Sequence, residues 1–146
     1  MHFDDLMGAA NISASGLSAE RLRMEVVANN IANAYSTRTP GGGPFRRQDV
    51  VFATVLKDRI RGGPRGKQGL AGVEAVDVVD DPSEFSRVFN PGHPDADPDG
   101  HVSMPNVRLP VEMVNLITAS RAYEANLKAL QLYRQMLEQA LTIGRT

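Results

Sequence analysis

Repeating apolar residues at both ends of the chain constrain its fold more than any other feature. Near the N-terminus, apolar side chains recur every seven positions: Phe3, Ala10, Leu17, Met24 and Ile31. Near the C-terminus, another heptad register begins after Pro110, with two polar members: Met113, Leu116, Ser120, Tyr123, Leu127, Leu130, Arg134, Leu137 and Leu141. Heptad spacing is typical of helices that pack along a seam. We predict two long terminal helices, each about 48 Å at 1.5 Å per residue.

The first heptad pattern is interrupted, and its apolar surface is wide. Ser13 and Glu20 break the register, and Gly16 costs about 1 kcal/mol relative to Ala inside a helix. A second apolar line on an adjacent face consists of Ile12, Ala19 and Val26. A helix with such a surface usually meets more than one neighbour. The two helices can lie antiparallel in a coiled-coil-like pair, but they cannot cover all of their apolar surface. We therefore expect them to order fully only on assembly with other copies.

The middle of the chain predicts a small β-rich insert. Pro and Gly residues at 39–44 stop the first helix. Strands are predicted at 45–60, 73–79 and 85–89, with a loop at 61–69 and an irregular stretch at 90–105. The predicted fold class is α+β. Its helical core is formed by residues 1–36 and 108–146, and its β-rich middle domain by residues 37–107.

Composition excludes several classes of protein. The chain has no Cys, so it can form neither a disulfide framework nor a thiolate site. Its formal net charge of -1 argues against binding to nucleic acid. We expect no membrane insertion and no cleaved signal peptide, because no apolar run approaches a transmembrane length and the N-terminus lacks a basic region followed by an apolar one.

The sequence contains no catalytic motif that we recognise. Neither a G-x-S-x-G nucleophile elbow nor a phosphate-binding loop ending in G-K-[ST] occurs. Glu112 and Glu124 on the last helix are interpreted as solvated or intersubunit carboxylates. We expect a non-enzymatic protein without catalytic residues and without a cofactor.

A possible cation site lies at Asp95–Gly100, which matches the first half of a calcium-binding loop. Asn106 stands where the loop would need a bidentate Glu, and Pro94 and Pro105 flank it. His93 and His101 add possible zinc ligands, but their spacing fits no common template. We expect a polar turn-rich loop and no metal, with a cation-binding protein as an alternative function.

Two further features allow more than one interpretation. Residues 46–67 carry seven basic and two acidic side chains, whereas residues 74–99 carry eight acidic and one basic. This contrast fits a solvated hairpin tip or charge complementarity between adjacent subunits. Asn29, Asn30 and Asn33 fit a fraying helix end or hydrogen bonds between helices or subunits.

Both helical segments carry a family resemblance. Leu22–Ala34, which reads LRMEVVANNIANA, resembles the N-terminal signature of bacterial flagellar rod and hook proteins. The stretches at 45–48 and 51–52 are also similar. Residues 113–126, which include ASRAYEAN, resemble the C-terminal signature of the same family, as does the end of the helix at 141–144.

The loop before the last helix narrows the resemblance. Residues 90–97 read NPGHPDAD and are followed by PNV at 105–107, a combination similar to the proximal-rod members of the family. The short chain agrees with those members. Position 101 departs from them, because it is His where the family tends to have Tyr.

The resemblance implies a structural subunit of the flagellar basal-body rod. Such a subunit is expected to leave the cell through the flagellar type III export apparatus, without signal cleavage. It would polymerise helically with itself and other rod proteins, above a rod-base adaptor at the MS ring, into the periplasm-crossing drive shaft and export channel. A helical adaptor module without a flagellar role is a further alternative. The residues expected at assembly interfaces are Leu17, Met24, Val27, Asn29, Asn30, Ile31, Asn33, Leu116, Tyr123, Asn126, Leu127, Leu130, Leu137 and Leu141.

Overall fold

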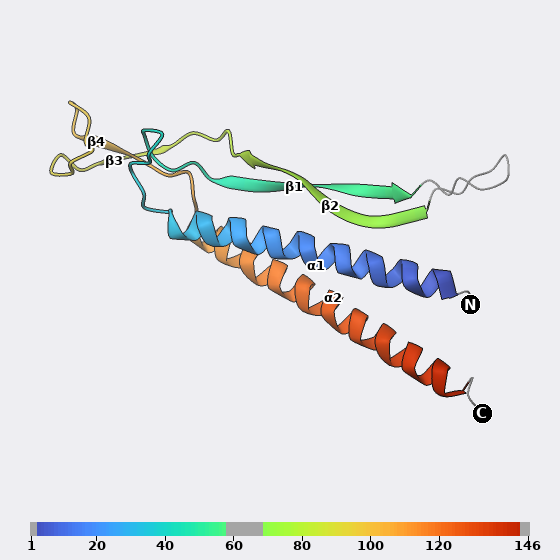
Figure 1. Cartoon of the computed structure of the whole chain (residues 1–146). Helices are drawn as coiled ribbons and strands as arrows, with labels where there is room; N and C mark the ends of the chain where they lie inside the picture. Colours follow the sequence, from blue (N-terminus) through green and yellow to red (C-terminus); the bar gives the residue numbers. More distant parts are fainter. Residues whose placement is uncertain (1–2, 58–68, 144–146) are drawn as a thin grey trace. The chain divides into compact units, whose positions relative to one another are not determined.

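Along the chain, four strands lie between two long terminal helices. The structure is a computed structural model, and it describes residues 3–57 and 69–143. Its elements are α1 (Phe3–Ala32), β1 (Gln48–Lys57), β2 (Gly69–Asp80), β3 (Ser86–Phe89), β4 (His101–Met104) and α2 (Leu109–Ile143) (Figure 1). The predicted α+β class is confirmed, with a helix at each end and an antiparallel β-rich middle.

The boundaries of the elements differ from the prediction in a few places. The strand predicted at 85–89 is confirmed as β3, but the stretch predicted to be irregular contains β4. This strand was missed because its four residues gain their regular conformation only by pairing with β3. The loop predicted at 61–69 falls outside the described residues, except for Gly69, which begins β2.

The strands form two separate two-stranded sheets. β1 pairs with β2, and their arrows run in opposite directions in Figure 1. β3 pairs with β4 in an antiparallel register that places Val88 opposite Val102 and Phe89 opposite His101. Val102 is only 2% exposed, whereas all of β3 is exposed. The short sheet therefore turns β4 toward the protein interior.

The chain divides into two compact units, and each takes segments from both helices. Unit 1 comprises residues 1–22, 52–76 and 119–146, and unit 2 comprises residues 23–51 and 77–118. These two units do not coincide with the predicted helical core and β-rich middle domain. That predicted division stays a prediction.

In unit 2, the end of α1 lies beside the beginning of α2. Buried apolar side chains of this unit come from α1, the segment after it and β4: Val26, Val27, Ala34 and Val102. After Ala32 the helix ends in local hydrogen bonds, in which the Asn33 side chain donates to the backbone and side-chain oxygens of Asn29, both at 3.0 Å. The predicted fraying of this end is replaced by a side-chain cap.

In unit 1, small residues allow the elements to approach closely. Ala19 of α1 and Ala119 of α2 are buried. A Cβ atom on Gly16 would lie 2.9 Å from the Asn126 side chain of α2, and one on Gly72 of β2 would collide with the Ser15 side chain. The Ser15 hydroxyl instead accepts a hydrogen bond of 3.1 Å from the backbone N–H of Val73. Gly16 thus serves helix packing, although Gly is unfavourable inside a helix.

Across the described residues, neither helix carries a segment that is both long and apolar enough to cross a membrane.

Candidate functional site

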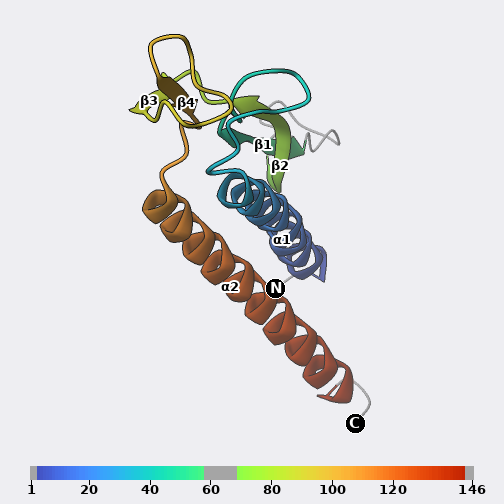
Figure 2. The ribbon, with the colours of Figure 1, turned by 90° about the vertical axis from the view of Figure 1, so that its left-hand side faces the viewer.

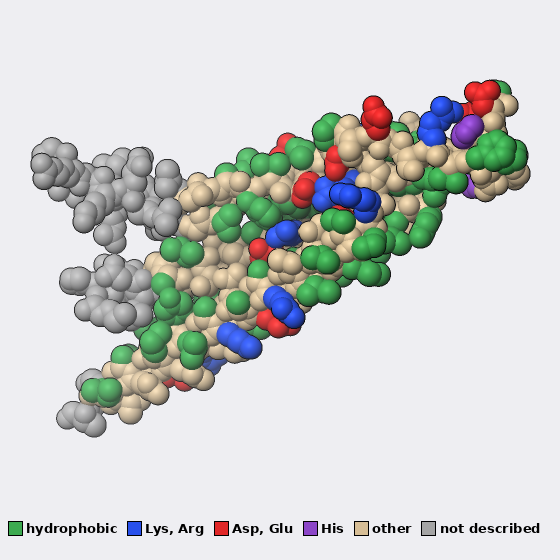
Figure 3. Space-filling model, turned by 180° about the vertical axis from the view of Figure 1, so that it is seen from behind, with side chains coloured by type: hydrophobic (Ala, Val, Ile, Leu, Met, Phe, Trp, Pro, Cys, Tyr) green, Lys and Arg blue, Asp and Glu red, His purple; other side chains and the backbone are tan. Residues whose placement is uncertain are grey.

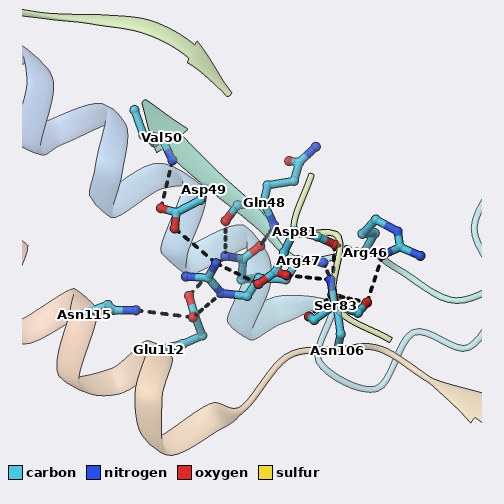
Figure 4. Close-up of polar contacts among 11 residues, drawn as sticks. Arg46, Arg47, Gln48, Asp49, Val50, Asp81, Ser83, Asn106, Glu112 and Asn115 are labelled. Carbon is cyan, nitrogen blue, oxygen red and sulfur yellow. Dashed lines mark hydrogen bonds and ion pairs between the residues drawn. The ribbon is translucent and has the colours of Figure 1, made fainter. Parts of the chain in front are cut away.

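A buried polar junction holds unit 2 together. This name stands for six hydrogen-bonded residues from six different segments. They are Asn30 of α1, Arg47 just before β1, Gln48 of β1, Asp81 between β2 and β3, Asn106 before α2, and Glu112 of α2. Figure 4 shows these contacts converging where the beginning of β1 meets the first turn of α2. The junction joins segments that are far apart in the chain.

Glu112 is the central carboxylate of the polar junction, and it is fully buried. Its Oε1 accepts a hydrogen bond of 2.8 Å from Arg47 Nε, and its Oε2 accepts one of 3.1 Å from Asn30 Nδ2. It also lies in the first turn of α2, where the helix dipole favours a negative charge. A buried charge is tolerated only when it is paired and hydrogen-bonded, and both conditions are met here. The interpretation of Glu112 as a solvated carboxylate is wrong, because tertiary packing covers it.

Asn30 binds the backbone at the start of β1. Its Oδ1 accepts a hydrogen bond of 2.9 Å from the Gln48 N–H, and its Nδ2 donates one of 2.8 Å to the Gln48 carbonyl oxygen. The side-chain amide thus takes the place of a neighbouring strand for this residue. Because Asn30 also contacts Glu112, one fully buried amide connects α1, β1 and α2.

Arg47 and Asn106 complete the polar junction. Asn106 Oδ1 accepts a hydrogen bond of 2.8 Å from the Arg47 backbone N–H, and its Nδ2 donates to the backbone oxygen of Asp81 and to the Ser83 hydroxyl at 3.2 and 2.9 Å. Burial alone would lower the pKa of Arg47, but its hydrogen bond and charge interaction with Glu112 outweigh this effect and raise the pKa. Arg47 therefore stays charged.

Two further carboxylates face Arg47: that of Asp49 at 3.2 Å and that of Asp81 at 3.3 Å. Hydrogen bonds from the backbone and hydroxyl of Ser83, followed by the charge of Arg47, lower the pKa of Asp81. Three carboxylates, from β1, the β2–β3 connection and α2, thus hold the guanidinium group of Arg47.

The loop at 90–100 uses its carboxylates for contacts within unit 2. Asp95 accepts a hydrogen bond of 2.8 Å from the Thr37 hydroxyl and lies 3.6 Å from Arg38. Asp97 accepts a hydrogen bond of 2.8 Å from the His101 backbone N–H and forms an ion pair with Arg87. Backbone donation from His101, then Arg87, lowers the pKa of Asp97.

Asp95 and Asp97 therefore have separate protein partners. Among the residues that the structure describes, no group of three or more His, Asp or Glu side chains is placed to hold a metal ion.

The predicted interface residues fall into three groups. Val27 and Asn30 are buried. Asn29, Leu127 and Leu141 are exposed. The others are half-buried: Leu17, Met24, Ile31, Asn33, Leu116, Tyr123, Asn126, Leu130 and Leu137. The structure brings Asn126 against Gly16, and it pairs Asn29 with Asn33 on the same helix. Their role in contacts between subunits stays a prediction.

The buried positions of α2 are mostly small or polar. In unit 2 the buried residue is Glu112, and in unit 1 it is Ala119, followed seven positions later by half-buried Asn126. These positions, 112, 119 and 126, each lie one residue before a position of the predicted heptad register, which has 113, 120 and 127. Large apolar side chains of α2 are exposed instead: Val111, Met113, Val114 and Ile117 in unit 2, and Leu127, Leu132, Met136 and Leu141 in unit 1. Figure 3 shows hydrophobic side chains at many places on the surface seen there.

The sequence analysis did not select Arg47, Asn106 or Glu112 as functional residues. A weak indication was available, because Asn106 belongs to the PNV stretch that carries the family resemblance. No local pattern could pair Arg47 with Glu112, since these residues are 65 positions apart.

Comparison with known proteins identifies the family. A family model described as "Flagella basal body rod protein" matches residues 11–38, and one described as "Flagellar basal body rod FlgEFG protein C-terminal" matches residues 99–143. Curated relatives match along almost the whole chain. The flagellar basal-body rod protein FlgC of Borreliella burgdorferi is 40% identical over 147 residues, which cover 94% of this chain and 97% of the relative.

Two further relatives carry the same name. FlgC of Yersinia enterocolitica is 40% identical over 96% of this chain and 98% of its own length. FlgC of Bacillus subtilis is 38% identical over 92% of this chain and 95% of its own length. Identity at this level over nearly full length shows common membership, and the chain therefore belongs to the FlgC family of flagellar basal-body rod proteins, a family of structural rod subunits.

Proposed function

We propose that this rod subunit belongs to the proximal rod and polymerises helically, with itself and with other rod proteins. The polymer would cross the periplasm as a drive shaft and enclose the export channel. The subunit would reach it unfolded, through the flagellar type III export apparatus and without signal cleavage. The rod would be joined to the MS ring through a rod-base adaptor. The names of the relatives support a place in the basal body.

One observation carries the polymerisation part of this proposal: several large apolar side chains of α2 are exposed, while Leu116, Leu130 and Leu137 are half-buried. Val114 and Ile117 in unit 2 are more than half exposed, and so is Leu132 in unit 1. Each large apolar side chain stabilises by about 1.5–3 kcal/mol when it is fully buried, so leaving several of them in water is unfavourable. A neighbouring subunit would supply the missing cover.

The contacts inside the subunit use a different kind of side chain. Where α1 meets α2, the closest approaches involve Gly16 with Asn126 in unit 1 and Asn30 with Glu112 in unit 2. On α2, polar Glu112 and small Ala119 thus occupy the buried positions, which leaves several large apolar side chains of this helix available to neighbours. An open helical polymer needs different patches to meet on successive copies, and several exposed surfaces suit that requirement.

The proposal is tested at Leu127, a predicted interface residue whose side chain is 40% exposed. Leu127→Asp should leave the subunit folded but abolish its incorporation into the rod and with it motility, because a carboxylate cannot be buried unpaired in an apolar contact. Incorporation is measured by immunoblotting of isolated basal bodies.

Leu127→Met is the matched control, because it keeps volume and hydrophobicity and should leave incorporation unchanged. A motile strain whose basal bodies contain the Leu127→Asp subunit in normal amount would contradict the assembly role of this surface. Absence of the unaltered protein from basal bodies would contradict the rod assignment itself.

A further inference from the structure

The only sulfur atoms of this chain belong to methionine, because the sequence has no Cys. Oxidation of a methionine thioether to the sulfoxide turns a flexible apolar side chain into a polar one. Exposure to water decides which thioethers a dissolved oxidant reaches. The surroundings of the side chain then decide whether the added oxygen matters, because a polar group is unfavourable in an apolar contact.

Unit 2 contains one exposed methionine and two that are better shielded. Met113, near the start of α2, is 54% exposed, whereas Met24 of α1 and Met104 of β4 are half-buried. Among the methionines whose side chains the structure describes, Met113 is the most exposed, and Met136 of unit 1 follows at 44%. The thioether of Met113 is therefore the most open to a small oxidant.

The polar junction turns Met113 outward. The preceding residue, Glu112, is fully buried and bonded to Arg47 and Asn30. Consecutive side chains of an α-helix point about 100° apart, so the inward position of Glu112 directs Met113 to another side of the helix. In Figures 1 and 2, the first turns of α2 have the end of α1 on one side and no other element of unit 2 on the opposite side.

Met113 lies among other exposed apolar side chains of α2. Ile117, one turn later on the same face, is 55% exposed, and the adjacent Val114 is 62% exposed. A sulfoxide at Met113 would place a hydrogen-bond acceptor in this apolar surface. A neighbouring subunit that covered the surface would have to bury that acceptor without a partner, which is unfavourable.

We propose that Met113 is a site of oxidation by peroxides, and that its oxidation before assembly keeps the subunit out of the rod. In this reaction the Met113 Sδ atom attacks one oxygen of hydrogen peroxide, so that an S–O bond forms while the O–O bond breaks. The thioether is oxidised to the sulfoxide, and the peroxide is reduced to water, which retains both protons. The effect on assembly rests on the proposed function, whereas the oxidation itself does not.

Oxidation rates in solution test the site. The purified full-length chain is treated with hydrogen peroxide and analysed by peptide mapping with mass spectrometry. We expect Met113 to be oxidised at least about fivefold faster than Met24 and Met104, because the folded protein shields their thioethers. In urea the three rates should converge. Equal rates in the folded chain would overturn the assignment of the site, whatever the protein does in the rod.

Two variants test the effect on assembly. Met113→Gln places a permanent polar group in the surface, and we expect its incorporation into basal bodies, measured by immunoblotting, to fall at least about tenfold. Met113→Leu keeps an apolar side chain of similar volume and has no thioether at this position. Peroxide added during growth should therefore reduce incorporation of the unaltered chain more than that of Met113→Leu.

Circular dichroism of the purified variants checks that their helices are retained. Normal incorporation of a folded Met113→Gln chain, or equal sensitivity of the unaltered and Met113→Leu chains to peroxide, would overturn the effect on assembly. Absence of the unaltered chain from basal bodies would instead contradict the proposed function, while the rates in solution still decide whether Met113 is the oxidation site.

Discussion

The polar junction of unit 2 and the outer surface of α2 use opposite kinds of side chain. At the junction, Glu112, Asn30 and Arg47 are largely withdrawn from water and satisfy one another. On the outer surface, Val114 and Leu132 are left in water. In an ordinary monomer the apolar groups would be inside and the charges outside. The contrast teaches that the most buried positions of α2 and its exposed large apolar side chains lie on different faces of the helix, an arrangement that suits the proposed assembly.

Charged and amide groups are suited to fixing the arrangement of segments within the subunit, because their hydrogen bonds are directional. A buried hydrogen-bonded group specifies one register, since any shift leaves a donor or acceptor unpaired. Apolar contacts are less directional, and they suit surfaces that must meet several neighbours. Whether the buried ion pair adds stability beyond a hydrophobic replacement is a separate matter, because its desolvation cost offsets much of its attraction.

The largest expected effect follows from removing the central carboxylate. Glu112→Ala should destabilise the subunit by about 3–5 kcal/mol, because Arg47 Nε and the Asn30 amide both lose their buried acceptor, even though Asp49 and Asp81 still pair with the guanidinium. Glu112→Gln keeps the shape and one acceptor, and should cost less. Urea unfolding of the purified monomer measures both.

The outer surface supplies the control for this prediction. Val114→Ser, on the exposed side of the same helix, should change the monomer by no more than about 0.5 kcal/mol. If Val114→Ser destabilised the monomer as much as Glu112→Ala, then the exposed apolar surface of α2 would contribute to the stability of the subunit, and the contrast with the polar junction would not hold.

A smaller effect is expected at the contact between α1 and β1. Asn30→Ala leaves the N–H and carbonyl groups of Gln48 without their side-chain partner, and should destabilise the subunit by about 1–3 kcal/mol. Asn33→Ala removes only a local helix cap and should cost about 1 kcal/mol or less. Equal losses in urea unfolding would show that Asn30 acts as a cap and not as a connection to β1.

The smallest effect is a dependence of stability on pH at the edge of the polar junction. The pKa of Asp81 is lowered in the folded protein from its ordinary value of 3.8, by its hydrogen bonds with Ser83 and by Arg47. Folding therefore gains stability from ionised Asp81 above that ordinary value, and loses it as the pH falls toward and through the lowered pKa. The free energy of unfolding should decline in this acidic range.

The matched variant is Asp81→Asn, in which the decline should be shallower. Other carboxylates titrate in the same range, so the comparison with the unaltered protein is what isolates the contribution of Asp81. Identical slopes in the two proteins would contradict a role for its ionised form.

The sequence predicted the elements better than their contacts. The helices and three of the four strands follow from apolar spacing and from the breakers at 39–44, which act over a few residues. β4 escaped prediction because His101–Met104 is a short polar-flanked segment that becomes a strand by pairing with β3. For the site, Asn30 was selected as a register-setting residue, but its partner Gln48 could not be named.

What the sequence determined by itself was the presence of two long helices, the β-rich middle and the family, since all three depend on residues close together in the chain. Tertiary structure alone decided which face of each helix turns inward. Asn30 and Glu112 meet across 82 positions, and the hydrogen bond between them turns the Glu112 face of α2 inward, against the face of α1 that carries Asn30. A heptad pattern records that a helix has an apolar side, but it cannot tell whether that side faces its own chain or another copy. The physical reason is that apolar burial is rewarded equally in either place.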